Sequence, residues 1–390
     1  MALYRRLVFL LTPPAITLVG HVYVAWQLIS ASPNTTVRLL IAVLMALMYL
    51  GITAGFLVRH DKSTPFNDAV LWLSFSLLGL FSWLFVLTVI RDLLLALLFL
   101  FALLFKPMPA LQASITTAGA WLIPVISLGA TILGFFNARR TPKIVPVDIY
   151  LDTLPAELDG LSFAQITDLH IGPTIKKDFV KKIVHATNEL NTDAIVLTGD
   201  LIDGDVHGLA EHTAALSLLS APLGVYAVTG NHEYYSGAEQ WVQEFKRLGL
   251  TVLENEHVVL KSADHKVVLA GVTDFDAQRF DANQASDPQA ALHGAPDDAV
   301  AKVLLAHQPR SMWAAAAAGF DLQLSGHTHG GQFWPWRYFV RLQQPLVAGL
   351  HQFQNLQVYI SQGTGYWGPP MRIRAQSEIS LIRLRAKRSK

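Results

Sequence analysis

The chain has 390 residues, of which 52% are hydrophobic and only 15% charged, and its net charge is +1. Because soluble domains carry about 25% charged residues and disordered chains are poor in apolar ones, this composition excludes a disordered protein. The absence of cysteine excludes a disulfide scaffold, and the near-zero net charge argues against a nucleic-acid partner held by bulk positive charge.

The charge deficit lies in the first third of the chain. Residues 1–140 contain nine Lys or Arg, three Asp and no Glu, too few for the surface of a soluble domain. Apolar runs of about 18 residues or more are long enough to cross a bilayer as helices. We therefore expect residues 1–140 to be a transmembrane region of about four helices. The four apolar runs are 7–29, 37–58, 69–90 and 111–136.

A shorter apolar stretch follows the third run. Residues 93–105 would rise only about 20 Å as a helix, too little to cross the membrane alone. This stretch is expected either to continue the third helix or to lie in the membrane surface. If it crossed, every later segment would change sides.

Loop charges predict the orientation. With four spans, one side of the membrane receives seven basic residues and the other receives two, Arg38 and Lys106. The side richer in Lys and Arg is normally cytoplasmic, so we expect both termini and the following domain in the cytoplasm. An extracytoplasmic domain remains the alternative, because paired arginines before an apolar run also occur in export signals. The seven basic residues are Arg5, Arg6, Arg59, Lys62, Arg139, Arg140 and Lys143.

The remainder of the chain alternates short apolar strands with helices, a pattern typical of an α/β domain with a buried sheet. Residues 141–160 are expected to be a connector with an edge strand at 145–151, and residues 274–298 a polar surface insertion. Helices are predicted at 176–190, 207–219, 238–248 and 311–318. Strands are predicted at 161–167, 194–197, 224–228, around 252, and at 258–260, 267–270, 303–305, 322–324, 357–360 and 378–384.

Five polar clusters follow these strands. Ligands of α/β sheets bind beyond the carboxyl ends of the strands, so the clusters are expected to converge there. Carboxylates and imidazoles are suitable ligands for Zn, Mn or Fe, and no thiolate is available. The clusters are Asp168-x-His170, Gly199-Asp200-x-x-Asp203, Gly230-Asn231-His232-Glu233, His307 and Gly326-His327-x-His329.

In this order the five motifs resemble those of the calcineurin-like metallophosphoesterase superfamily. The resemblance covers residues from about 145 to 386, with the domain itself placed at 161–386. It implies a four-layer α/β/β/α sandwich with a two-metal site. With its apolar N-terminal region, the chain is similar to the membrane-associated branch, including the enzymes that cleave the pyrophosphate of UDP-2,3-diacylglucosamine. That similarity implies a bacterial inner-membrane protein.

The resemblance also implies roles for individual residues. Asp200 would bridge two divalent ions, Mn first, with Fe, Zn or Mg open. His232 would contact the phosphate or protonate the leaving oxygen, and Asp203 would orient it. One ion would be held by Asp168, His170 and His329, and the other by Asn231, His307 and His327.

The expected activity is cleavage of a phosphodiester or pyrophosphate by metal-activated hydroxide, on a phospholipid or another lipid-linked phosphoester. Two alternatives remain: a membrane transporter or receptor with a regulatory metal-binding domain, and a phosphoesterase acting on soluble nucleotides or phosphoproteins. Sparse charge within the apolar runs argues against the transporter.

Three further features are open. Arg372 and Arg374 could bind phosphate or lie at a solvated strand end. Aromatic residues at 333–339 could line an apolar groove, touch the membrane interface or belong to the core. Glu233 is expected to stabilise its own loop.

Overall fold

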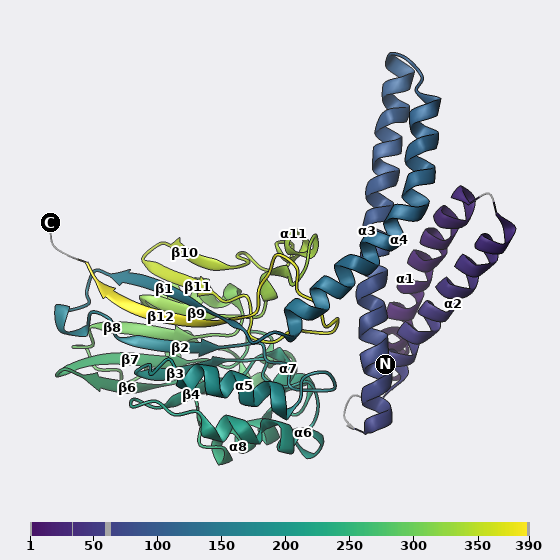
Figure 1. Ribbon diagram of the computed structural model, residues 1–390. Coiled ribbons are helices and arrows are strands. Elements are labelled where there is room, and N and C mark those ends of the chain that lie inside the picture. The colour runs from purple at the N-terminus through teal and green to yellow at the C-terminus, as the bar shows by residue number, and fades with distance from the viewer. Residues whose placement is uncertain (1, 33, 59–63, 388–390) are drawn as a thin grey trace. The chain divides into compact units, whose positions relative to one another are not determined.

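The computed structural model describes residues 2–32, 34–58 and 64–387 (Figure 1). The described residues divide into two compact units. The first contains the residues up to 136 together with 368–371, and the second contains 137–367 and 372–387. Arg59 and Lys62, which entered the orientation argument, lie outside the described residues.

Four long helices form most of the first unit. Each is long and apolar enough to cross a membrane, as the sequence predicted. Two of them have side-chain caps: Asn34 accepts hydrogen bonds from the backbone of residues 36 and 37, and Thr64 accepts one from residue 67, which satisfies otherwise unpaired amides. The helices are α1 (Ala2–Ala31), α2 (Thr35–Leu57), α3 (Pro65–Leu104) and α4 (Pro109–Arg139).

The stretch at 93–105 continues the third helix. Helix α3 runs unbroken for 40 residues, a rise of about 60 Å. Residues 93–104 therefore form no separate span, which agrees with the first of the two alternatives. The count of four candidate spans is unchanged.

A polar network joins α1 to α3. Arg91 is buried, and its guanidinium donates to Asp92 Oδ1 at 2.6 Å and to Gln27 Oε1 at 2.8 Å. The Tyr23 hydroxyl donates to Asp92 Oδ2 at 2.6 Å. Pairing of this kind is what allows an ionisable residue to be buried among apolar helices.

Two six-stranded sheets form the centre of the second unit (Figure 1). The first has the order β1-β12-β2-β3-β4-β5, and the second has the order β10-β11-β9-β8-β7-β6. Strands β2, β3 and β4 of the first sheet run parallel, as do β7, β8 and β9 of the second. Within each sheet, the carboxyl ends of these strands therefore lie at one edge. The bounds are β1 (Lys143–Leu151), β2 (Ser162–Ile166), β3 (Ala194–Thr198), β4 (Val225–Val228), β5 (Thr251–Val252), β6 (Glu256–Ser262), β7 (His265–Gly271), β8 (Ala301–Leu305), β9 (Leu322–Ser325), β10 (Gly349–Phe353), β11 (Leu356–Ile360) and β12 (Glu378–Ala386).

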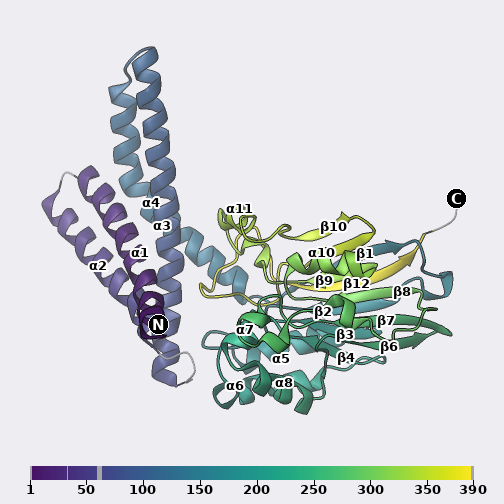
Figure 2. The ribbon, with the colours of Figure 1, turned by 180° about the vertical axis from the view of Figure 1, so that it is seen from behind.

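Each sheet is apolar on both faces. In β3, Ala194 and Val196 pack between the sheets, whereas Ile195 and Leu197 pack under helices, as the alternation of side chains along a strand requires. Helices α5 (Lys177–Asn188), α6 (Val206–Thr213) and α8 (Ala238–Arg247) cover the first sheet (Figure 1). Helices α9 (Pro288–Ala291) and α10 (Met312–Ala318) pack on the second (Figure 2). The predicted four-layer sandwich is confirmed.

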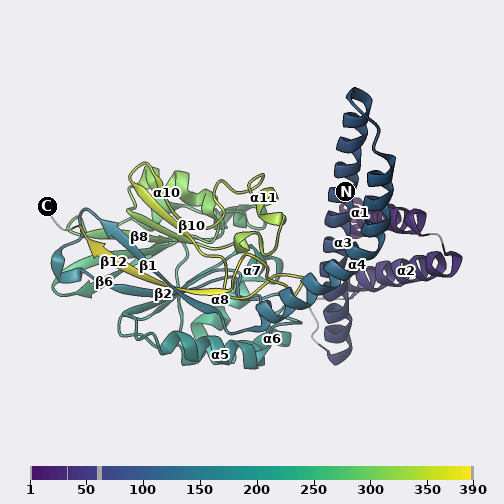
Figure 3. The ribbon, with the colours of Figure 1, turned by 45° about the horizontal axis from the view of Figure 1, so that its top comes forward.

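Some helices and strands of this unit differ in their bounds from the sequence prediction. Strand β1 lies at an edge beside β12 (Figure 3), as predicted for the connector. The helix expected at 207–219 ends at Thr213 and continues as a 3₁₀ turn over 214–218. Apart from 3₁₀ turns, four short elements had no predicted counterpart: α7 (Asn231–Tyr235), α9, α11 (Trp336–Val340) and strand β10.

Candidate metal centre

The five polar clusters meet at the carboxyl ends of β2, β3, β4, β8 and β9. The two sheets are joined there, because the backbone amide of His327 donates to both carboxylate oxygens of Asp168, at 2.9 and 3.0 Å. Gly326 permits this approach, since a Cβ at that position would lie 2.2 Å from Asp168 Oδ2. Gly230 does the same beside Asp200, with a Cβ 2.3 Å from Oδ1.

Most of the expected ligands have a strained backbone. Five of the seven have φ between 51° and 71°, the left-handed region that non-glycine residues seldom adopt. Such conformations cost of order 1–3 kcal/mol each and concentrate at functional sites. The chain therefore gives up stability to turn these side chains inward. The five are Asp168, His170, Asp200, His327 and His329.

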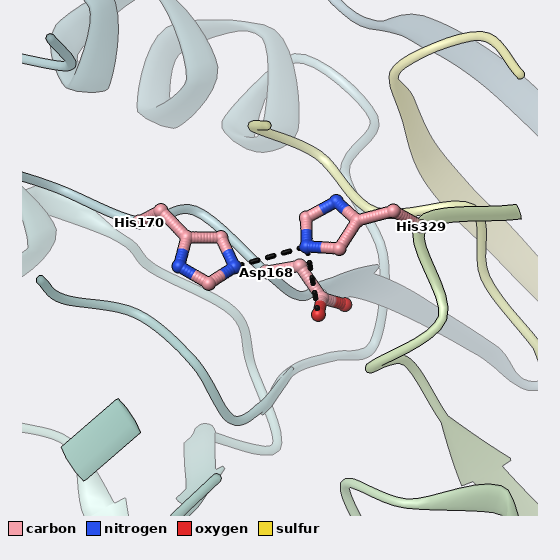
Figure 4. Close-up of side chains that lie close together, drawn as sticks. All are labelled: Asp168, His170 and His329. Carbon is pink, nitrogen blue, oxygen red and sulfur yellow. Dashed lines mark hydrogen bonds and ion pairs between the residues drawn. The ribbon is translucent and has the colours of Figure 1, made fainter. Parts of the chain in front are cut away.

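The first cluster consists of Asp168, His170 and His329 (Figure 4). The Nε2 atoms of the two histidines lie 2.9 Å apart, and His329 Nε2 is 3.5 Å from Asp168 Oδ1. All three residues are buried. Their ligand atoms face a common point, so this cluster fits one divalent ion.

The second cluster consists of Asp200, His307 and His327. His307 Nε2 lies 3.1 Å from Asp200 Oδ2 and 3.2 Å from His327 Nδ1. The Nδ1 of His307 lies 2.8 Å from the carbonyl oxygen of Thr198. A hydrogen bond of this kind fixes the tautomer and leaves the other ring nitrogen available to a metal.

Asp200 belongs to more than one cluster. Its Oδ2 is also 4.0 Å from Nε2 of His170, so the same carboxylate faces ligands of both ions. The Oδ1 atom of Asn231 is buried without a hydrogen-bond partner among the described residues. An unpaired buried oxygen is costly unless a cation compensates it, and this donor set of imidazole, carboxylate and amide fits divalent transition metals.

His232 lies beside the second cluster and is oriented by Asp203. Asp203 Oδ1 is 2.5 Å from Nδ1 of His232 and 2.9 Å from Nδ1 of His170. Burial alone would lower the pKa of His232, but the carboxylates of Asp200 and Asp203 raise it to about 9. Burial would likewise raise the pKa of Asp203, yet the two histidines hold it below its ordinary range.

Glu233 binds the loops that carry the ligands. Its buried carboxylate accepts hydrogen bonds from the amides of Asp200 at 3.0 Å, Leu201 at 2.8 Å and Gly230 at 2.6 Å. Burial is the main reason that its pKa is raised to about 7. Glu233 was expected to stabilise only its own loop, but it joins the loop after β4 to the one after β3.

Comparison with known proteins supports this geometry. Residues 161–331 match the family model for calcineurin-like phosphoesterases. A transmembrane protein with a metallophosphoesterase domain from Danio rerio is 35% identical over 67% of this chain and 61% of its own length. An uncharacterized metallophosphoesterase from Helicobacter pylori is 38% identical over 66% of this chain and 68% of its own length. Another from Aquifex aeolicus is 30% identical over 66% of this chain and 98% of its own length.

The chain belongs to the calcineurin-like phosphoesterase family. The predicted class, a metal-dependent phosphoesterase, is confirmed at the level of this family, whose members use a binuclear divalent metal centre. The long apolar helices, together with the relative named as a transmembrane protein, support a membrane protein. The chain spans 61% of that Danio rerio relative.

Arg372 and Arg374 differ in their exposure and in their contacts in this phosphoesterase. The sequence left Arg372 either to bind phosphate or to lie at a solvated strand end, but it is buried and donates to the carbonyl oxygens of Gly365 at 2.6 Å, Gln362 at 2.6 Å and His329 at 3.0 Å. Its Nη2 also lies 3.0 Å from Nδ1 of His329. With its N–H groups used in this way, Arg372 positions the His329 loop. Arg374 is exposed, so its side chain can still meet a substrate.

Two groups of neighbouring exposed aromatic residues occur in the second unit. In the segment 333–339, Phe333 is buried, whereas Tyr338 and Phe339 of α11 are exposed. The segment therefore belongs neither wholly to the core nor wholly to an exposed groove or interface. A second group, which the sequence analysis did not identify, lies beside His232. It comprises Tyr235, Phe280 and Trp367. Phe280 and Trp367 lie far from His232 in the sequence, so no motif could have revealed the group.

Proposed function

We propose that this protein is a membrane-anchored phosphohydrolase that cleaves a phosphodiester or pyrophosphate bond, and that its substrate is lipid-linked. One observation carries the proposal: Asp200 faces His170 on one side and His307 on the other, with His232 alongside at 3.9 Å. A shared carboxylate of this kind can hold two cations close together, as phosphoester hydrolysis by two-metal sites requires.

Different side chains would bind the metal ions, donate the proton and bind the phosphate. Asp168, His170 and His329 would hold one ion, Asn231, His307 and His327 the other, and Asp200 both, with Mn²⁺ the preferred metal. When bound, such ions supply positive charge to the phosphate and increase the acidity of a coordinated water. Asp203 would hold the ring of His232 by Nδ1, so that Nε2 can donate a proton to the leaving oxygen. Arg374 would contact the phosphate.

The membrane helices motivate the choice of substrate. A chain with four apolar helices is held where lipid-linked phosphoesters are concentrated. We also propose a bacterial inner-membrane location with the phosphoesterase domain in the cytoplasm, on the basis of the loop charges. Reporter fusions after α4 would show the side directly: activity of a periplasm-dependent reporter would contradict the cytoplasmic placement.

Hydrolysis of bis-p-nitrophenyl phosphate by the purified full-length chain tests the reaction. Turnover should require added Mn²⁺, disappear with a chelator and fall by about 10³-fold in Asp200→Asn, because losing the shared carboxylate charge removes an electrostatic contribution of that size. Equal rates for Asp200→Asn and wild type would refute the assignment. A panel of membrane phosphoesters tests the substrate: turnover of soluble nucleotides with none of any lipid would refute the lipid-linked part alone.

A further inference from the structure

Three exposed aromatic side chains lie around His232. Tyr235 is 61% exposed, Phe280 52% and Trp367 56%. The His232 ring centroid is 5.1 Å from that of Tyr235 and 5.9 Å from that of Trp367, and Tyr235 is 5.6 Å from Phe280. Single exposed aromatics are ordinary on a protein surface, but a contiguous group of them marks a site of interaction.

Two of these residues have fixed supports although their rings are exposed. The backbone of Trp367 is fixed by the largely buried side chain of Gln332, which accepts from Trp367 N and donates to Trp367 O, both at 2.9 Å. Phe280 contacts Tyr234, whose hydroxyl donates to Gln284 at 3.1 Å. A preformed apolar surface binds a ligand at lower entropic cost than a mobile one.

We infer that Tyr235, Phe280 and Trp367 form a subsite for the apolar part of the leaving alcohol, and that this part is an alkyl or acyl chain. The inference rests on the proposed function, in which His232 protonates the leaving oxygen. Whatever is bonded to that oxygen starts next to His232, where Tyr235 and Trp367 lie against the imidazole ring and Phe280 extends the apolar surface beyond Tyr235. Binding a remote apolar group there contributes to transition-state stabilisation as well as to affinity.

The angles between the rings favour a chain over a flat base. His232 and Tyr235 are inclined at 61°, His232 and Trp367 at 78°, and Tyr235 and Phe280 at 56°. A nucleobase stacks best between nearly parallel faces, and these neighbouring rings are not parallel. A flexible alkyl chain can follow mutually inclined surfaces, and burying its methylene groups is favourable.

A series of O-methyl S-alkyl phosphorothiolates with methyl, butyl and octyl leaving groups tests this subsite. In each turnover, water adds to phosphorus, the P–S bond breaks, and the sulfur leaves as the protonated thiol, with methyl phosphate as the other product. Because the chain has no cysteine, a thiol reagent reports only the released product. The full-length protein with Mn²⁺ is assayed below the micelle concentration of the octyl ester.

In the wild type, kcat/KM should rise by at least about tenfold from the methyl to the octyl ester. Trp367→Ala and Phe280→Ala should each reduce this octyl-to-methyl ratio several-fold. Trp313→Ala removes a ring on α10 that is 51% exposed and should leave the ratio unchanged. Because the outcome is a ratio within one preparation, and two rings are tested separately, poor folding of one variant does not obscure it.

The outcomes separate this inference from the proposed function. If no ester is hydrolysed, the proposed function fails. If all esters are hydrolysed at equal kcat/KM, or if the ratio survives both ring substitutions, only the subsite is refuted. An ester of 5′-thiothymidine provides the last comparison: a kcat/KM above that of the octyl ester, lost in Trp367→Ala, would assign the rings to a nucleobase and overturn the choice of a chain.

Discussion

The Oδ1 atom of Asp203 lies 2.5 Å from Nδ1 of His232. The same oxygen is 2.9 Å from Nδ1 of His170, so one carboxylate fixes both the proposed general acid and a proposed metal ligand.

Replacing the carboxylate of Asp203 should slow turnover. Asp203→Asn removes the negative charge that both imidazoles face, and we expect kcat to fall by about 10²-fold, within the usual contribution of general acid catalysis. The measurement is steady-state hydrolysis of bis-p-nitrophenyl phosphate with Mn²⁺. Asp297→Asn, at an exposed position, is the matched control. An unchanged kcat in Asp203→Asn would show that Asp203 does not orient His232.

The pH dependence should change in a defined direction. The carboxylates of Asp200 and Asp203 overcome burial and raise the pKa of His232 to about 9, so the protonated acid is retained through neutral pH and lost as the pH rises above this value. Removing Asp203 removes one of the groups that raise the pKa. The alkaline limb of kcat/KM should therefore move to lower pH in Asp203→Asn. A limb that stays in place would mean that another group titrates there.

Glu233 should matter for stability and for metal binding together. Glu233→Gln places an amide NH₂ against one of three backbone amides, a buried mismatch worth about 1–3 kcal/mol. We expect a lower midpoint of thermal unfolding and a weaker apparent affinity for Mn²⁺, because the loop that carries Asp200 loses a hydrogen bond to residue 233 at Asp200 or at Leu201. Glu239→Gln, exposed on α8, serves as the control. Normal Mn²⁺ affinity in Glu233→Gln would contradict the link between the two loops.

Arg372 and Arg374 should behave differently when replaced by alanine. Arg372→Ala leaves several buried carbonyl oxygens without donors, so unfolding should become easier by about 3 kcal/mol or more. Arg374→Ala should leave the unfolding midpoint unchanged and raise KM. The measurements are thermal unfolding and steady-state kinetics. If Arg372→Ala raises KM without lowering the unfolding midpoint, Arg372 binds substrate, which is one of the two alternatives that the sequence left open.

Much of the fold was predictable because the spacing of apolar residues along a strand or helix indicates which of its faces are buried. Strand β3 is buried throughout and apolar up to Thr198 since both faces are covered, and α5 has a clear apolar side because only one face is. The candidate metal cluster was predictable because its ligands follow strands whose carboxyl ends share an edge. Residues brought together by loops were not: Trp367 reaches His232 through a segment with no regular pattern, and Phe280 reaches Tyr235 from the insertion predicted to be surface.

Arg372 illustrates a different difficulty. From the sequence, an arginine near a phosphate site indicates phosphate binding, because guanidinium matches phosphate geometry. The guanidinium N–H groups can also donate to backbone carbonyl oxygens. In the structure they donate to the carbonyls of residues 329, 362, 363 and 365.

The central claim is that one shared carboxylate holds two metal ions that hydrolyse a phosphoester. Measuring bound Mn²⁺ per chain and turnover on the same preparation of full-length protein tests it most directly. We predict about two ions per chain at full activity, with both metal content and turnover falling in Asp200→Asn. Full turnover with one ion or none, or an Asp200→Asn variant that keeps both ions and its activity, would contradict the account.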